Sequence, residues 1–175
     1  HNIAYLYRII GRFDLSIKYM NASLAVKPDY EHALDGIGNV YIWMHEYEKS
    51  HETVLNFERH FPNSDRVFLK KGYSLLLLKR YEEAIPYFYK KIEVLPNDSR
   101  AYNNLGRCYA KMGDFEKATH CFSEALIRDS TNSFVYHNRA SMYYDLGKFQ
   151  MACADLSRAI QEEYNWVIDS TLYDL

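Results

Sequence analysis

A repeat of 34 residues runs through the chain and limits its possible folds more than any other feature. When residues 99–132 are taken as one repeat, the others are 31–64, 65–98 and 133–166, without insertions, and residues 1–30 enter a preceding repeat at its fifth position. Position 8 of the repeat is always small, and it holds Ala4, Gly38, Gly72, Gly106 and Ala140. Position 20 is also always small, with Ser16, Ser50, Ala84, Ala118 and Ala152. Such self-similarity predicts stacked copies of one supersecondary unit.

The apolar positions within each repeat have helical spacing. Positions 4, 7, 8 and 11 share one face of a helix, and positions 17, 20, 24 and 27 share one face of a second helix. A short turn is expected near positions 14–16. Proline at position 32 ends the second helix, because the residue before a proline disfavours the α conformation. The prolines at this position are Pro28, Pro62 and Pro96. Each repeat is therefore predicted to be two amphipathic helices joined by a short turn.

This pattern resembles the tetratricopeptide repeat family over residues 1–166. The period, the small residues, the aromatic residues at positions 11 and 17 and the proline at position 32 all match, most fully in residues 99–132. The resemblance implies an all-α, right-handed superhelical solenoid in which the first helices line a concave surface. Residues 1–166 are expected to form this single solenoid, and residues 167–175 a partial capping helix or a tail. Four residues depart from the pattern, namely Phe57 and Lys91 at position 27 and Lys71 and Arg139 at position 7.

Composition narrows the classes of function. The net charge is −2, with 48% hydrophobic and 25% charged residues, which argues against a general binder of nucleic acid. There are three cysteines and no CxxC motif, no membrane span and no signal peptide, so we expect a cytoplasmic protein. No catalytic or phosphate-binding motif is present. We therefore expect a protein that is not an enzyme and needs no cofactor or metal. The best metal-like group, His120 and Cys121 with Cys108, is interpreted as core packing.

The candidate binding residues lie at the positions that face inward in the related family. In the repeats 65–98 and 99–132 these positions hold five cations and no acid. Arginine binds carboxylates through parallel hydrogen bonds, and asparagine amides match a peptide backbone. These residues predict a groove for a peptide that is acidic or has a free C-terminal carboxylate. The predicted partner-binding residues are Asn39, Arg66, Lys70, Tyr73, Arg100, Asn103, Asn104, Arg107, Lys111 and Asn138.

Other interpretations stay open at this point. The inner-face aromatic residues Trp43, Tyr73, Phe134 and Tyr144 are either binding anchors or internal packing. The set of residues that clamps chaperone tails in one subclass of the family is not reproduced here. The alternative to a peptide-binding scaffold is a self-assembly or regulatory segment of a longer polypeptide, with a homodimer formed through the uncapped amino-terminal repeat. Stacking of single-stranded RNA on aromatic and basic side chains is a weaker alternative.

Overall fold

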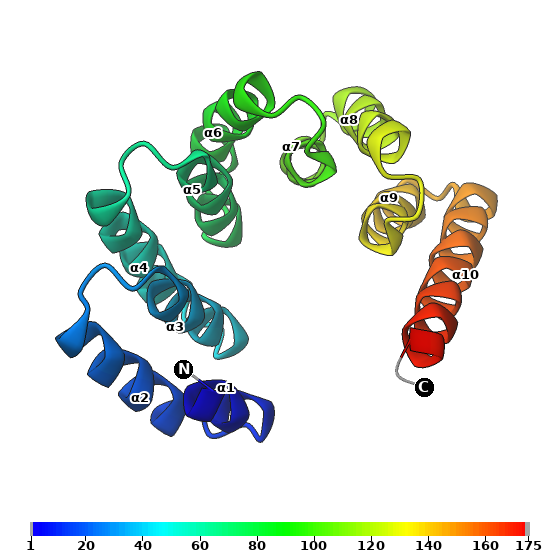
Figure 1. The fold of residues 1–175 in the computed structure, drawn as a ribbon. Coiled ribbons are helices and arrows are strands. Elements are labelled where there is room, and N and C mark those ends of the chain that lie inside the picture. The colour runs from blue at the N-terminus through cyan, green and yellow to red at the C-terminus, as the bar shows by residue number, and fades with distance from the viewer. Residues whose placement is uncertain (1, 174–175) are drawn as a thin grey trace. The chain divides into compact units, whose positions relative to one another are not determined.

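The computed structural model describes the backbone of residues 2–173 and the side chains of residues 3–163. Over this range the chain forms ten helices and no strand, which confirms an all-α solenoid of helix-turn-helix repeats (Figure 1). The helices are α1 (Asn2–Ile9), α2 (Phe13–Val26), α3 (Glu31–Trp43), α4 (Tyr47–His60), α5 (Asp65–Leu77), α6 (Tyr81–Val94), α7 (Ser99–Met112), α8 (Phe115–Arg128), α9 (Ser133–Asp145) and α10 (Phe149–Tyr173). Odd-numbered helices are thus the first helices of the repeats, and even-numbered helices are the second.

The helices fall into two compact units, the N-terminal unit His1–Tyr87 and the C-terminal unit Phe88–Leu175, whose boundary lies within α6. In the N-terminal unit α2 packs on α1 and α3, and α4 packs on α3 and α5. In the C-terminal unit α8 packs on α7 and α9, and α9 packs on α10. Helices that are adjacent in the sequence are therefore also adjacent in space within each unit.

The small residues at repeat positions 8 and 20 hold the two helices of each repeat together. All ten are buried. At Gly106 an added Cβ atom would lie 2.8 Å from the ring of Phe122, and at Gly38 it would lie 2.7 Å from Thr53 Oγ1. The backbone of each first helix thus runs directly against side chains of the second helix, and only glycine leaves the necessary space at these two positions.

The turns between paired helices share one backbone conformation. Repeat position 15 has a positive φ angle in all five repeats, with 75° at Gly11, 59° at His45, 61° at Lys79, 83° at Gly113 and 69° at Gly147. This left-handed conformation ends the first helix and reverses the chain. Glycine adopts it without strain, but His45 and Lys79 adopt it at a cost in free energy.

The four departures from the family pattern are each accommodated locally. Phe57 packs in a core cluster with Leu34 and Val67. Lys91 is 1% exposed, and its Nζ lies 3.7 Å from a carboxylate oxygen of Asp98. The remaining two residues form ion pairs, Lys71 with Glu58 and Arg139 with Asp155.

The last helix is longer than the others. Helix α10 continues without a break through residues 167–173, which the sequence assigns to a capping helix or tail, and residues 174–175 lie outside the described residues. None of the helices is both long enough and apolar enough to cross a membrane, among the residues that the structure describes.

Candidate functional site

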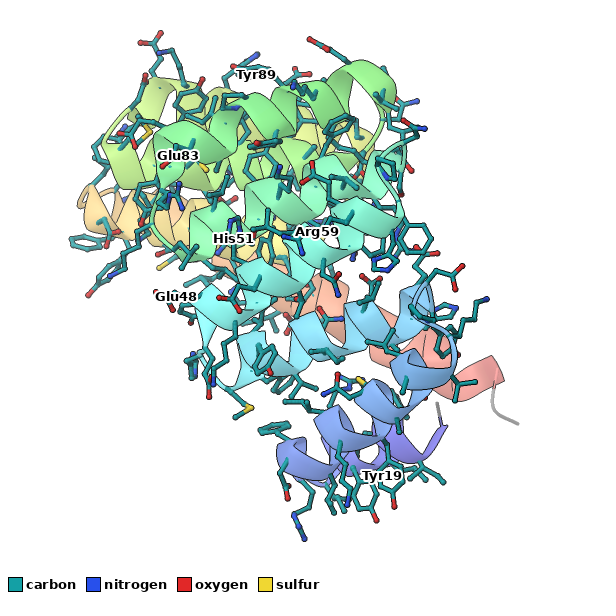
Figure 2. The ribbon with its side chains drawn as sticks, turned by 90° about the vertical axis from the view of Figure 1, so that its left-hand side faces the viewer. Tyr19, Glu48, His51, Arg59, Glu83 and Tyr89 are labelled. Carbon is teal, nitrogen blue, oxygen red and sulfur yellow. The ribbon has the colours of Figure 1, made fainter. Side chains whose placement is uncertain are left out.

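The ten predicted binding residues all lie on first helices. Asn39 is on α3 and Asn138 is on α9, and the others are Arg66, Lys70 and Tyr73 on α5 and Arg100, Asn103, Asn104, Arg107 and Lys111 on α7. Figure 2 views α2 and α4 from their outer side, where the labelled Tyr19, Glu48 and Arg59 lie. The predicted residues lie on the other helix of each repeat.

In the N-terminal unit the two predicted cations are paired with acids from the preceding repeat. Arg66 donates hydrogen bonds to Asp35 at 2.6 Å and to Glu31, and Lys70 donates to the second carboxylate oxygen of Asp35. The Asp35 side chain is 16% exposed and lies between both cations. Two positive and two negative charges therefore cancel in this cluster, and α3 and α5 are tied together by it.

The sequence prediction does not include this neutralisation, because it considers the charges of each repeat separately. The partners Asp35 and Lys70 are 35 residues apart, which is one repeat period plus one residue. First helices of successive repeats lie side by side, so residues separated by about one period can meet. Comparing charges across one period would have found the pairing.

In the C-terminal unit four of the predicted residues form two hydrogen-bonded pairs. Asn138 Nδ2 of α9 donates to Asn103 Oδ1 of α7 at 3.0 Å, and Arg107 donates to Asn104 Oδ1 at 3.1 Å. Asn104 is only 8% exposed, whereas Lys111, one turn beyond Arg107, is exposed. The two hydrogen bonds restrict the orientation of three side chains on α7, while Lys111 faces solvent.

Arg100 is bound to an acid at the start of its own helix. Its guanidinium binds both carboxylate oxygens of Asp98, at 2.9 and 2.7 Å, and the same Asp98 caps the first turn of α7 by accepting from the backbone of Arg100. A carboxylate at a helix N-terminus also interacts favourably with the helix dipole. Arg100 thus supports the start of α7 as well as contributing charge at its surface.

Three of the four aromatic residues that are expected to be either binding anchors or internal packing are largely exposed. Trp43 is 64% exposed, Phe134 is 72% exposed and Tyr144 is 66% exposed. Only Tyr144 makes a ring contact with another aromatic residue, Phe149, at 5.5 Å between centroids, among the ring contacts of the described residues. Tyr73 is half-buried. Internal packing therefore does not account for most of the surface of the first three.

No cluster of three or more His, Cys, Asp or Glu side chains that could hold a metal ion occurs in the described part of the chain. Burial raises the pKa of Cys121 to about 12, so this residue remains a neutral thiol in the core. Cys108 is also buried. Both cysteines behave as small apolar residues.

Stacked helix pairs with a tightly packed interior define a helical-repeat scaffold for protein interactions. Tetratricopeptide repeat family models match residues 1–30 and 135–165, residues 36–98 and residues 99–132. The chain belongs to the tetratricopeptide repeat family. This repeat is typically an interaction module without catalytic activity.

Several solved structures share the fold. MamA from Desulfovibrio magneticus RS-1 is 20% identical, with a TM-score of 0.71, over 94% of this chain and 93% of that one. TTC0263, a thermophilic TPR protein of Thermus thermophilus, is 17% identical with a TM-score of 0.79, over 92% and 88% of the two chains. YrrB, described as a TPR protein with an unusual peptide-binding site, is 21% identical with a TM-score of 0.60, over 99% and 90%. Comparison with curated proteins gives no match.

Proposed function

We propose that the chain binds an extended segment of a protein partner on the inner face of its first helices. The peptide is acidic or ends in a free carboxylate, and its principal contacts are on α7 and α9. The observation that carries this proposal is the presence of two hydrogen-bonded pairs, Asn138 with Asn103 and Arg107 with Asn104, on the helices that also hold the exposed Lys111. YrrB, which shares the fold, is described as having a peptide-binding site, and this supports the same class of ligand here.

The side chains of these two pairs have hydrogen-bonding groups that suit a peptide ligand. An asparagine amide has two donor hydrogens and an acceptor oxygen, so a pair joined by one hydrogen bond keeps donors and acceptors for a peptide backbone. Arg107 and Lys111 supply positive charge for an acidic side chain or a terminal carboxylate. In the N-terminal unit Arg66 and Lys70 are neutralised by their own acids, whereas Lys111 of the C-terminal unit is exposed, so we place the anionic group in the C-terminal unit.

The test is capture from a random peptide library that is prepared both as free acids and as C-terminal amides. Wild-type protein is expected to retain acidic or free-acid peptides, and Arg107→Glu is expected to lose them. The matched control is Arg59→Glu, which makes the same charge change at an exposed position of the second helix α4. Helicity and thermal unfolding are compared for all three proteins. Retention of the same peptides by Arg107→Glu would overturn this assignment.

We infer a second candidate function, self-association through the amino-terminal repeat. Ile3 and Leu6 of α1 occupy repeat positions 7 and 10 and are 55% and 60% exposed. At the same positions of the next repeat, Ile37 and Val40 are 5% and 0% exposed, because α2 and α4 cover that helix. A second copy packed on α1 would bury an equivalent apolar surface.

Sedimentation at increasing concentration tests this second candidate. If the chain forms a homodimer, the sedimentation mass of wild type should rise with concentration. The Leu6→Glu variant should keep the mass of a monomer at every concentration. The control is Leu156→Glu on α10, which is exposed at 39% and lies outside this surface. A wild-type chain that remains monomeric at every concentration contradicts self-association.

We also infer that the protein works in a reducing compartment such as the cytoplasm, without chemistry of its own. All three cysteines, Cys108, Cys121 and Cys153, are free, which supports this placement. Alkylation in freshly lysed cells should label the exposed Cys153 completely. A disulfide at Cys153 in that experiment would contradict the inference.

A further inference from the structure

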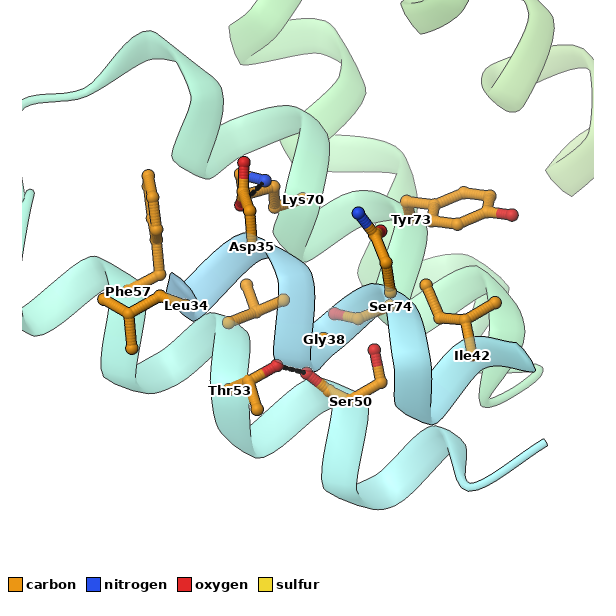
Figure 3. A pocket seen from close by; sticks show the side chains of 12 residues that line it. Leu34, Asp35, Gly38, Ile42, Ser50, Thr53, Phe57, Lys70, Tyr73 and Ser74 are labelled. Atoms are coloured by element: carbon orange, nitrogen blue, oxygen red, sulfur yellow. Dashed lines mark hydrogen bonds and ion pairs between the residues drawn. The ribbon is translucent and has the colours of Figure 1, made fainter. Parts of the chain in front are cut away.

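A cavity of about 60 Å³ lies between α3, α4 and α5 in the N-terminal unit. Its walls include the apolar side chains of Leu34, Ile42 and Phe57, and the exposed Asn39 also lines it. Figure 3 shows Ser50 of α4 opposite Gly38 of α3 among the lining residues. Because this space has both apolar walls and polar groups, it differs from a packing defect in an apolar core.

The Ser50 side chain carries an unused hydroxyl at this cavity. Ser50 is 2% exposed, and its Oγ lies 4.0 Å from the point where a Cβ atom on Gly38 would be. Thr53 donates to the backbone oxygen of Ser50 at 2.6 Å, but Ser50 Oγ makes no hydrogen bond to any described residue. Its oxygen is not fully enclosed, because Asn132 Oδ1 is the one fully buried side-chain oxygen or nitrogen without a partner in the described residues. A group that enters the cavity can therefore exchange a hydrogen bond with this hydroxyl.

Other repeats show that no serine is required at this position. The equivalent Ser16 is also buried, but its hydroxyl donates to the backbone oxygen of Ala4 at 2.8 Å. The three remaining repeats have alanine there, at Ala84, Ala118 and Ala152. Packing alone is satisfied by alanine, so the hydroxyl of Ser50 is an addition with no internal hydrogen bond.

The size and polarity of the cavity limit what can occupy it. A volume of about 60 Å³ accommodates roughly two to four water-sized groups. The Ser50 hydroxyl and the Asn39 amide both donate and accept hydrogen bonds, and the apolar walls suit a methyl group. Asp35 and Lys70 also line the cavity and form an ion pair with each other, so the walls favour neither an acidic nor a basic occupant. A hydroxyl and a methyl group on one branched carbon, as in threonine, match these features, and serine matches all but the methyl contact.

We propose that this cavity is an anchor pocket for a short hydroxyl-bearing side chain, threonine or serine, of the peptide partner. The inference rests on the proposed function, because the side chain belongs to the bound peptide. It adds to that function a contact in the N-terminal unit that selects by side-chain shape and hydrogen bonding rather than by charge.

The experiment titrates N-acetyl-threonine methylamide and its valine analogue into protein with labelled methyl groups, observed by NMR. Valine replaces the hydroxyl of threonine by a methyl group at nearly constant volume. The threonine probe is expected to shift the methyl signals of Leu34, Ile42 and Val54, which line the cavity, and to bind about 3- to 10-fold more tightly than the valine probe. In Ser50→Ala this preference should vanish. Ser50→Ala is expected to fold, because alanine occupies the same position in three other repeats.

The matched control is Ser16→Ala, which removes a hydroxyl at the same repeat position outside the cavity and should keep the preference for threonine. The proposal is overturned if the two probes bind equally or if the preference for threonine survives in Ser50→Ala. It is also overturned if the three methyl signals do not shift, which would mean that the cavity holds only water. The probes have no charge, so the result does not depend on Arg107. Failure of the proposed peptide binding in the library assay can therefore be distinguished from failure of the proposed anchor pocket.

Discussion

The guanidinium of Arg139 on α9 donates two hydrogen bonds to the carboxylate of Asp155 on α10, at 2.8 and 2.7 Å. Both side chains are largely buried, with 18% and 9% of their surfaces exposed. The hydrogen bonds to Asp155 raise the pKa of the Arg139 guanidinium above its ordinary value, so the arginine remains charged. The tie between the two helices of this repeat is thus an ion pair where the family pattern has leucine at the position of Arg139.

We expect Asp155→Ala to lower the free energy of unfolding by about 2–4 kcal/mol, because it leaves a mostly buried guanidinium without its partner. The double variant Arg139→Leu with Asp155→Ala should lie closer to wild type than the sum of the two single changes predicts, since both charges are removed together. Urea unfolding of wild type, Asp155→Ala, Arg139→Leu and the double variant measures the coupling. An additive result in this double-mutant cycle would show that the two residues contribute independently.

The strained turns give a second prediction. Lys79 has a φ angle of 61°, and a left-handed conformation costs a residue other than glycine about 1–2 kcal/mol. Lys79→Gly should therefore raise the free energy of unfolding by about 1 kcal/mol. Gly113→Ala, at the equivalent turn with a φ angle of 83°, should lower it by a similar amount. Thermal or urea unfolding tests both, and the prediction is wrong if the two changes have the same sign.

Close packing between paired helices gives a third prediction. In Gly106→Ala the new Cβ atom would lie 2.8 Å from the fully buried ring of Phe122, so we expect a loss of about 1–3 kcal/mol. Gly36→Ala meets only the flexible end of Met20, at 2.6 Å, and the gain in helix propensity should offset most of that contact. Urea unfolding compares the two variants. Equal losses would mean that flexibility of the neighbouring side chain does not matter.

The stability of the protein should depend on pH through His51. Burial, together with the positive charges of Arg80 and Lys71, lowers the pKa of His51 below its ordinary value of 6.5. The unfolded chain takes up a proton near pH 6.5 that the folded protein takes up only at lower pH. Neutral His51 therefore makes its full contribution to the free energy of unfolding above pH 6.5. This contribution falls as the pH drops below 6.5.

The measurement is urea unfolding at about pH 7.5 and about pH 5.5. In His51→Gln the difference between the two pH values should be smaller than in wild type. His60→Gln changes an exposed histidine of the same helix and should leave the difference unchanged. Identical behaviour of the two variants would argue against a special contribution from His51.

Charge balance in the N-terminal unit gives a functional prediction. Asp35→Asn removes the carboxylate that binds both Arg66 and Lys70 while keeping the side-chain volume. The released positive charge should strengthen capture of acidic peptides several-fold, mainly through faster association, and added salt should weaken this gain. Surface plasmon resonance at low and high salt measures it. Unchanged or weaker capture at low salt would show that the N-terminal unit does not contact the anionic group.

Much of the fold could be predicted from the sequence, because its determinants repeat every 34 residues. The small residues at positions 8 and 20 mark the contact between paired helices, and the structure buries every one of them. The charge cluster of Asp35 with Lys70 was not predicted, because it depends on which residues of successive first helices meet. The unused hydroxyl of Ser50 could not be predicted either, since Ser16 occupies the same position and has a hydrogen bond.

The pairing of Arg66 and Lys70 with acids of the preceding repeat has a consequence for how a repeat protein of this kind can evolve. The charge that a first helix presents to a ligand is set jointly by that helix and by the repeat before it. Removing residues 31–64 by recombination would expose both cations of α5 without altering any residue of α5. Gain or loss of a whole repeat thus provides a route to new ligand preferences in which every remaining helix keeps its sequence.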